Sequence, residues 1–197
     1  MLEVRGVQVL DHKPISPDNF WAIYDEAIKA GDKCFAALLL VALNNASYSG
    51  EVASIKWSEI DFQSGGFVSR RPKTGISRIA MLWPAALDAL KVLPKEDDQV
   101  FVTPAGRCYK VVAVRERFNL YRAAAGVEKD VLFAAIRDAA HSVAMHGADF
   151  AKSELLLGHK LPGTADCYLR RNPQLVKVAC EAISKAFDVA GHTGTIR

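Results

Sequence analysis

The sequence contains no long hydrophobic segment and no recognisable secretion signal. No apolar run approaches the ~20 residues that a helix needs to cross a bilayer. The first six residues do not show the charged and then apolar pattern of a signal peptide. We therefore expect no membrane partner and a cytoplasmic location.

Cysteine and histidine are scarce and are not spaced as metal ligands. No CxxC motif occurs among the four cysteines, which are Cys34, Cys108, Cys167 and Cys180. His141 and His146 are five residues apart, which places them on different faces of a helix. We expect reduced thiols, no metal site and no cofactor.

The sequence also lacks a large excess of positive or negative charge, since 25 Lys and Arg against 22 Asp and Glu give a net charge of only +3. A nucleic-acid partner must therefore be argued from local clusters of cations. One cluster lies in residues 107–122, where Glu116 is the only acid, and others lie nearer the C-terminus. The cluster over 107–122 is either a solvated helix face or a surface for DNA phosphates. The candidate DNA-binding cations of the whole sequence are Arg70, Arg71, Arg107, Lys110, Arg115, Arg122, Lys160 and Arg170.

The sequence is rich in helix signals. Ser16-Pro17-Asp18 is typical of a helix start, because the serine caps a free N–H and proline suits the first turn. We predict a helix from there to Gly31, a nearly all-apolar and therefore buried helix over 34–43, and a short helix over 49–56.

The middle of the chain predicts strands. Residues 67–70 and 78–82 are short β-type runs separated by a turn that contains Gly75, which favours an antiparallel hairpin. From Trp83 onward the pattern is helical, with breaks near 94–104, Gly126, Gly147 and Pro162. The prediction is a mainly α fold with a small antiparallel β-sheet (α+β), with a tail or linker at 1–15, one domain at 16–190 and a tail at 191–197.

The most informative segment spans residues 157–170. It contains Leu-Gly-His ending at His159, then Thr164 and Tyr168, and nine positions separate His159 from Tyr168. This pattern resembles the signature of the tyrosine recombinase (phage integrase) family, in which the tyrosine attacks DNA.

Three further segments fall in the order of that family. Residues 49–61, with Glu51, resemble the segment that follows the family's first arginine. Lys73 lies on the predicted hairpin like the family's hairpin lysine, and 133–138, with Arg137, occupies the place of the His-x-x-Arg box. The resemblance covers roughly residues 17–188 and implies a recombinase catalytic-domain fold, with no core-binding domain in this chain.

The resemblance also implies roles. Arg137 would clamp the phosphate, Lys73 would protonate the leaving oxygen, His159 would donate a hydrogen bond to the phosphate, and Tyr168 would be the nucleophile. Cations suit this chemistry because attack adds charge to the phosphate oxygens, and a tyrosine with a pKa near ~10 needs help to lose its proton. Taken singly, each residue also fits a structural role, such as a helix-face tyrosine or a histidine beside a glycine stop.

Two positions depart from the family pattern. Tyr48 stands where the family's first arginine belongs, and Ala134 stands where the box histidine belongs. Arg70 and Arg71 on the hairpin are candidates to substitute, and His141 is a weaker one because it lies one helical turn beyond Arg137. The site therefore looks degenerate.

Three functions remain open. The first is a DNA-binding, mobile-element protein with impaired or inactive strand cleavage, nucleoid-associated when bound to DNA. The second is an active recombinase that forms a 3′-phosphotyrosyl intermediate with substitute ligands, and the third is a helical interaction domain that no longer touches DNA. An apolar face on the helix predicted at 173–187 either docks on its own domain or, as the resemblance implies, joins a second copy or a partner recombinase.

Overall fold

The computed structural model describes residues 14–70, 75–163 and 169–194. Its first elements are α1 (Pro17–Lys29), α2 (Lys33–Asn44), α3 (Ser49–Ala53) and the short 3₁₀ helix η1 (Trp57–Glu59). Ser16 caps α1 by accepting a hydrogen bond from the backbone N–H of Asn19 at 3.2 Å, and Pro17 opens the helix. The predicted start of α1 is confirmed.

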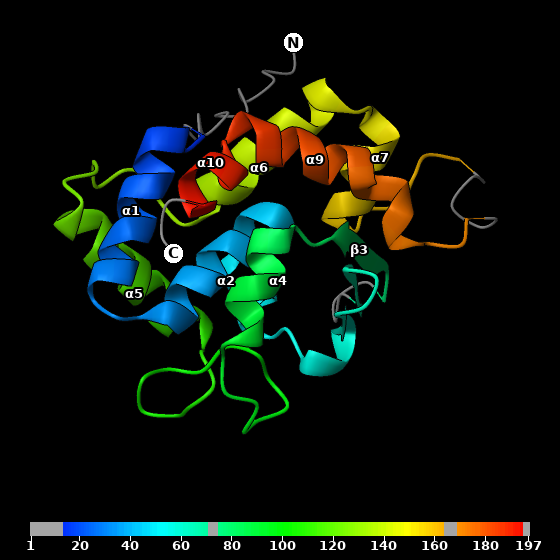
Figure 1. Ribbon diagram of the computed structural model, residues 1–197. Coiled ribbons are helices and arrows are strands. Elements are labelled where there is room, and N and C mark those ends of the chain that lie inside the picture. The colour runs from blue at the N-terminus through cyan, green and yellow to red at the C-terminus, as the bar shows by residue number, and fades with distance from the viewer. Residues whose placement is uncertain (1–13, 71–74, 164–168, 195–197) are drawn as a thin grey trace, which may run out of the picture.

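The apolar helix α2 is the centre of the fold, as predicted. Every residue from Phe35 to Asn44 is buried, and α2 contacts α1, α3, α4, α6 and α9. Figure 1 shows α2 beside α4 (Pro84–Lys91), with α6, α9 and α10 on one side of the pair. A helix surrounded in this way has no need of a polar face, which explains its nearly all-apolar sequence.

The β-sheet has one strand more than predicted. β2 (Gly66–Arg70) and β3 (Ser77–Met81) pair antiparallel with Ser69 opposite Arg78, so the predicted hairpin is confirmed. The additional strand, β1 (Ile60–Asp61), pairs antiparallel with β2 at the sheet edge. Two residues are too few to show the alternation that identifies a strand in sequence.

The C-terminal half is mostly helical but more interrupted than predicted. After α4 a long loop leads to α5 (Val111–Ala124), followed by α6 (Ala134–Gly147) and α7 (Phe150–Leu157). The single helix predicted over 173–187 is wrong in its first turn, because Asn172 caps the 3₁₀ helix η2 (Pro173–Val176) before α9 (Lys177–Ala186) begins. The last element is α10 (Val189–Gly194), where the sequence predicted a tail from residue 191.

Both ends of the described chain pack on the domain. Ile15 is buried and its N–H donates to the carbonyl of Ala135 at 3.1 Å. In α10, His192 stacks on Trp21 of α1 with ring centroids 4.1 Å apart, and its Nε2 lies 2.8 Å from Oδ1 of Asp25. The packed unit therefore extends past the expected boundaries at residues 15/16 and 190/191.

Two polar contacts fix the sheet to the helices. The buried Asn44 amide at the end of α2 donates to the carbonyl of Met81 at 3.0 Å and accepts from the N–H of Trp83 at 2.8 Å. The indole of Trp83 in turn donates to the carbonyl of Cys180 in α9 at 2.8 Å. The strand that carries the candidate site is thereby held against both α2 and α9. None of the helices described is long and apolar enough to span a membrane.

Candidate active site

Arg137 lies in the second turn of α6 and points toward the end of α2. It is only 5% exposed. Its Nη1 donates to the carbonyl of Ala46 at 3.0 Å and to Oε2 of Glu51 at 3.1 Å. A buried guanidinium is stable only when its donors are matched, and here a carboxylate and a backbone carbonyl supply the match.

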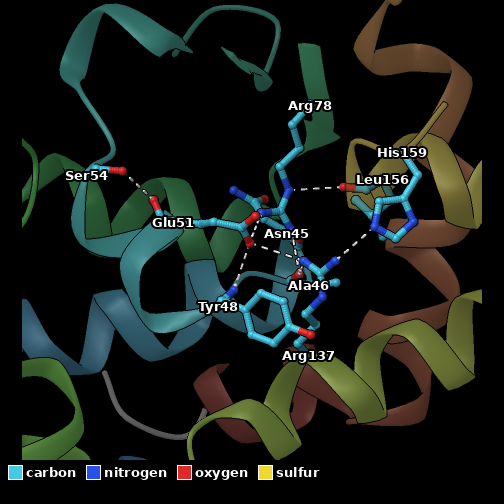
Figure 2. A network of polar contacts seen from close by, with 9 residues as sticks. All are labelled: Asn45, Ala46, Tyr48, Glu51, Ser54, Arg78, Arg137, Leu156 and His159. Carbon is cyan, nitrogen blue, oxygen red and sulfur yellow. Dashed lines mark hydrogen bonds and ion pairs between the residues drawn. The ribbon is translucent and has the colours of Figure 1, made fainter. Parts of the chain in front are cut away.

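Arg78 of β3 shares these partners and is buried still more deeply, at 2% exposure. Its Nη1 donates to Oε2 of Glu51 at 2.7 Å and its Nε donates to the carbonyl of Leu156 at 3.1 Å. Its Nη2 donates to the carbonyls of Asn45 and Ala46. Figure 2 shows the Arg78 side chain coming from above and the Arg137 side chain from below to the Glu51 carboxylate.

Sequence reasoning did not identify Arg78 as a site residue. A signal was present, because Arg78 follows Ser77 and precedes Ile79 and Ala80 in a strand whose middle is otherwise apolar. An arginine in a buried strand position requires an acidic partner nearby. The partner, Glu51, is 27 residues earlier in the chain, so only the fold could show the pair.

Glu51 is the acceptor at the centre of the arginine network. It is the third residue of α3, and its Oε2 also accepts from the N–H of Tyr48 at 2.9 Å, which caps the helix. Ala46, just before this cap, has a φ of 47°. That left-handed conformation is unusual for alanine, and it accompanies a carbonyl that accepts from both arginines.

Tyr48 stands where the resemblance places the family's first arginine. It is 44% exposed, and the centroid of its ring lies 4.1 Å from Cζ of Arg137. Figure 2 shows the ring beside the Arg137 guanidinium. The contact is a cation–π pair, in which the tyrosine supports the arginine but adds no positive charge of its own.

His159 reaches the same guanidinium from the end of α7. Gly158 ends that helix in a left-handed conformation with a φ of 69°, which turns the chain so that His159 faces Arg137. Its Nε2 lies 3.4 Å from Nη2 of Arg137 and its Nδ1 lies 3.0 Å from Oε2 of Glu154. These partners fit the neutral tautomer with its proton on Nδ1, since guanidinium can only donate and carboxylate can only accept.

Two further residues complete the surroundings of His159. Arg171 donates to the carbonyl of Ser77 at 2.9 Å and to the carbonyl of His159 at 2.7 Å, which joins the hairpin to the histidine loop. His141 points to the other oxygen of Glu154, with its Nε2 3.8 Å away. Burial lowers the pKa of His141, and the positive charge of Arg137 acts in the same direction against the attraction of Glu154.

The structure thus brings together some of the predicted site residues. Arg137, His159 and Tyr48 meet in one network, and Ala134 lies one helical turn before Arg137 on α6. Lys73, Arg71 and Tyr168 lie outside the described residues.

The hairpin residue Arg70 is exposed and borders the same region. Together with Tyr48, Glu51 and Arg78 it lines a cavity of about 550 Å³ between α3 and the sheet, which we call the hairpin cavity. Tyr48, which stands where the resemblance places an arginine, and Arg70, the candidate substitute, therefore line the same cavity.

The cations predicted to contact DNA differ in their availability. Most are exposed, namely Arg107, Lys110, Arg115, Lys160 and Arg170. Arg115 also donates from Nε to the hydroxyl of Ser49 at 3.3 Å. Arg122 is half-buried and donates to the carbonyls of Lys129 and Val131, so it stabilises the loop that follows α5.

The arrangement is a cationic cluster suited to an oxyanion. The described residues of this region include the two carboxylates of Glu51 and Glu154 and three arginines, which are Arg78, Arg137 and Arg171. Arginine favours phosphate because its planar fork of donors matches two phosphate oxygens. Among the residues described, no group of three or more His, Cys, Asp or Glu side chains is placed to hold a metal ion.

The family model of the phage integrase family matches residues 13–174. The chain belongs to the phage integrase family. The match runs from before α1 into η2 and includes Glu51, Arg137 and His159. The cationic cluster therefore lies within the residues that the family model matches.

Solved integrase structures share this fold. The catalytic core of lambda integrase is 20% identical, with a TM-score of 0.63 over 75% of this chain and 96% of that one. The integrase from mycobacterium phage Brujita is 16% identical, with a TM-score of 0.69 over 87% of this chain and 57% of that one. A lambda integrase dimer bound to a COC′ core site is 19% identical, with a TM-score of 0.63 over 76% of this chain.

This integrase-family chain spans 58% of that DNA-bound lambda integrase chain. No curated protein matches it. At identities of this level the similarity establishes the mainly α fold with its small antiparallel sheet, and the chemistry must be argued from the side chains.

Proposed function

We propose that this integrase-family chain binds double-stranded DNA and that its strand cleavage is impaired or absent. The observation that carries the proposal is the pair formed by Tyr48 and Arg137. At the position where the resemblance calls for an arginine, an aromatic ring lies against the remaining guanidinium. The second departure, Ala134, carries no group that can contact a phosphate.

The expected loss of rate is large. Removing one preorganised donor at a developing oxyanion lowers kcat by ~10² to 10³, and an arginine acting on a phosphoryl group contributes ~10³ to 10⁵. The ring of Tyr48 covers a face of Arg137 without adding in-plane donors to it. Arg137 would then contact the phosphate without two of the partners that the resemblance calls for in the transition state.

Exposed cations support the DNA partner. Five of them lie outside the arginine network on α5, on the loop before it and on the segment around His159, and they are Arg107, Lys110, Arg115, Lys160 and Arg170. The lambda integrase structure that shares the fold is a dimer bound to DNA. Assembly through the C-terminal helices and association with the nucleoid form part of the same proposal.

Trapping of a covalent adduct tests the cleavage half of the proposal. A nicked duplex that traps a phosphotyrosyl adduct would be incubated with the chain, and the adduct would be counted on a denaturing gel. We expect no adduct from the natural sequence and a clear rise from the double variant Tyr48→Arg/Ala134→His. Tyr168→Phe in that background should remove the adduct again. Adduct formation by the natural sequence at ordinary recombinase rates would overturn the proposal.

A second candidate is an active recombinase with a substitute arginine, and one observation favours it. Arg70 is exposed and lines the hairpin cavity with Tyr48 and Glu51. If Arg70 supplies the missing charge, the natural sequence forms an adduct and Arg70→Ala abolishes it. Lys95→Ala, a change of an exposed cation outside that cavity, is the matched control.

The third possibility, an interaction domain without DNA, is tested by salt dependence. Binding to a generic duplex would be measured by fluorescence anisotropy from 50 to 300 mM salt, with each phosphate contact contributing about −0.9 to the log–log slope. We expect a slope of about −3 to −5. Binding that is absent at low salt would exclude the DNA-binding half of the proposal.

A further inference from the structure

A second cavity lies on the other side of Tyr48, between α3, α5 and the start of α6. Its volume is about 340 Å³, and we call it the α5 cavity. Tyr48 and Ala134, the two residues that depart from the family pattern, both line it. Because Ala134 forms part of the wall, a histidine or any longer side chain at that position would fill part of the space. The space in the cavity therefore depends on the residues at these two positions, Tyr48 and Ala134.

Aromatic rings form much of the cavity wall. Phe133 and Phe118 line it and are buried, and Tyr48 lines it while its ring rests on Arg137. Rings held by packing offer flat faces against which a planar ligand can stack. The volume is at the small end of the ~300–1,000 Å³ of small-molecule sites, which suits one ring system.

Polar groups lie along the same wall. The Ser49 hydroxyl accepts from Nε of Arg115 at 3.3 Å, which fixes that guanidinium at the cavity. Asn119 is one helical turn beyond Arg115 on α5, and its amide has no hydrogen-bond partner among the described residues. A carboxamide presents a donor and an acceptor side by side, and this is the pattern that pairs with the N6 and N7 edge of adenine.

We propose that the α5 cavity binds an unpaired nucleobase, with adenine preferred. The exposed ring of Tyr48 would stack on the base, the buried Phe133 would form the wall behind it, and Asn119 would hydrogen-bond its edge, as aromatic and amide groups do in single-strand recognition. The inference rests on the proposed function for its source of bases, since DNA held on the exposed cations would present them. An inorganic phosphate is the rival ligand, because Arg115 is a cation.

The test compares two sources of base. In the first arm, a duplex with a single unpaired 2-aminopurine, a fluorescent adenine analogue, competes with the fully paired duplex in anisotropy measurements. We expect about tenfold tighter binding of the unpaired form and quenching of its fluorescence by stacking. In the second arm, free adenosine is titrated and followed by the NMR signals of α5, with inorganic phosphate as the comparison ligand.

Two variants make the test specific. Asn119→Ala removes the amide and Ala134→Leu fills the cavity, and both should reduce the tenfold preference to about onefold while leaving affinity for the paired duplex unchanged. Ala151→Leu, an exposed position on α7, is the matched control and should keep the preference. Thermal unfolding would establish that all three variants are folded.

The outcomes separate this inference from the proposed function. If no duplex binds, the proposed function fails while adenosine still reports on the cavity. If paired DNA binds but neither the unpaired base nor adenosine is preferred, the inference is overturned and the proposed function stands. Signal changes caused by phosphate alone, lost in Arg115→Ala and kept in Asn119→Ala, would also overturn it in favour of an anion site.

Discussion

Asp32 and Glu51 both accept hydrogen bonds from arginines, and they do so in different ways. The buried Asp32 caps α2 by accepting from the N–H of Phe35 at 3.1 Å, and its other oxygen accepts from Nε of Arg117 at 2.6 Å and from the Tyr121 hydroxyl at 2.9 Å. The half-buried Glu51 lies inside the first turn of α3, where it accepts from the N–H of the capping residue Tyr48 and from two guanidiniums, those of Arg78 and Arg137.

The difference lies in the balance of charge. In the Asp32 cluster one carboxylate meets one guanidinium and a neutral hydroxyl, and burial together with the bond to Asp32 raises the pKa of Tyr121 to about 12. The Asp32 carboxylate and the Arg117 guanidinium therefore pair one to one. In the Glu51 cluster one carboxylate accepts from two guanidiniums, and backbone carbonyls accept from them as well. We expect an anion to bind beside two guanidiniums that share a carboxylate rather than beside a one-to-one pair, because guanidinium groups match the oxygens of an oxyanion.

The largest expected difference between the clusters concerns stability. Arg78→Met should lower the free energy of unfolding by about 3–5 kcal/mol, because it removes a deeply buried partner of Glu51 and strands several carbonyls. Arg117→Met should cost about 1–2 kcal/mol, since 30% of that side chain is exposed. Urea denaturation followed by tryptophan fluorescence measures both, and equal losses would contradict the distinction.

Changing the carboxylates themselves should give the next largest contrast. Glu51→Gln removes the carboxylate that the two buried guanidiniums of Arg78 and Arg137 share and should destabilise the fold by about 2–4 kcal/mol. Asp32→Asn keeps an Oδ1 that caps the helix, but its Nδ2 cannot accept from Arg117 or Tyr121, so a loss of about 1–2 kcal/mol is expected. Glu116→Gln, at an exposed position on α5, controls for the loss of one acidic charge and should change stability by less than ~0.5 kcal/mol.

Added phosphate should distinguish the clusters without a change of fold. An anion that binds only the folded chain at about ten times its Kd adds about 1.4 kcal/mol, which raises Tm by roughly 3–5 °C for a domain of this size. Arg137→Gln should abolish the rise, whereas Arg117→Gln should retain it. A rise that survives Arg137→Gln would assign the anion to another part of the surface.

The smallest effect concerns pH. The pKa of His141 is lowered from its usual 6.5, so the unfolded chain binds this proton more readily than the folded chain. Its contribution to stability is complete above pH ~6.5 and is lost as pH falls below that value. His141→Gln should flatten the decline in stability between pH 6.5 and pH 5, and His146→Gln, at an exposed position, should leave the decline unchanged.

Local signals allowed much of the fold to be predicted. The cap at Ser16, the apolar run of α2 and the paired runs of the hairpin each depend on a few neighbouring residues. α10 could not be predicted in this way, because its six residues include Gly191 and Gly194 and have little helix propensity. Its helix is held by the docking of His192 on Trp21, a contact between the two ends of the chain.

The site was predicted only where a motif carried it. Arg137 and His159 were identified from the resemblance, and the structure places them beside one another. Arg78 was not identified as a site residue because its partners lie far away in sequence, 78 residues for the Leu156 carbonyl. The spacing of residues in a sequence predicts which side chains share a face of one helix or one strand. It does not predict contacts between different elements.

The contact made by Arg171 has a mechanical consequence. Its guanidinium donates one hydrogen bond to the backbone carbonyl of Ser77 in β3 and one to the backbone carbonyl of His159 in the loop after α7. A displacement of the hairpin would therefore pass to the backbone of His159 through these two hydrogen bonds. The strand and the histidine loop should shift together, because the Arg171 guanidinium joins them.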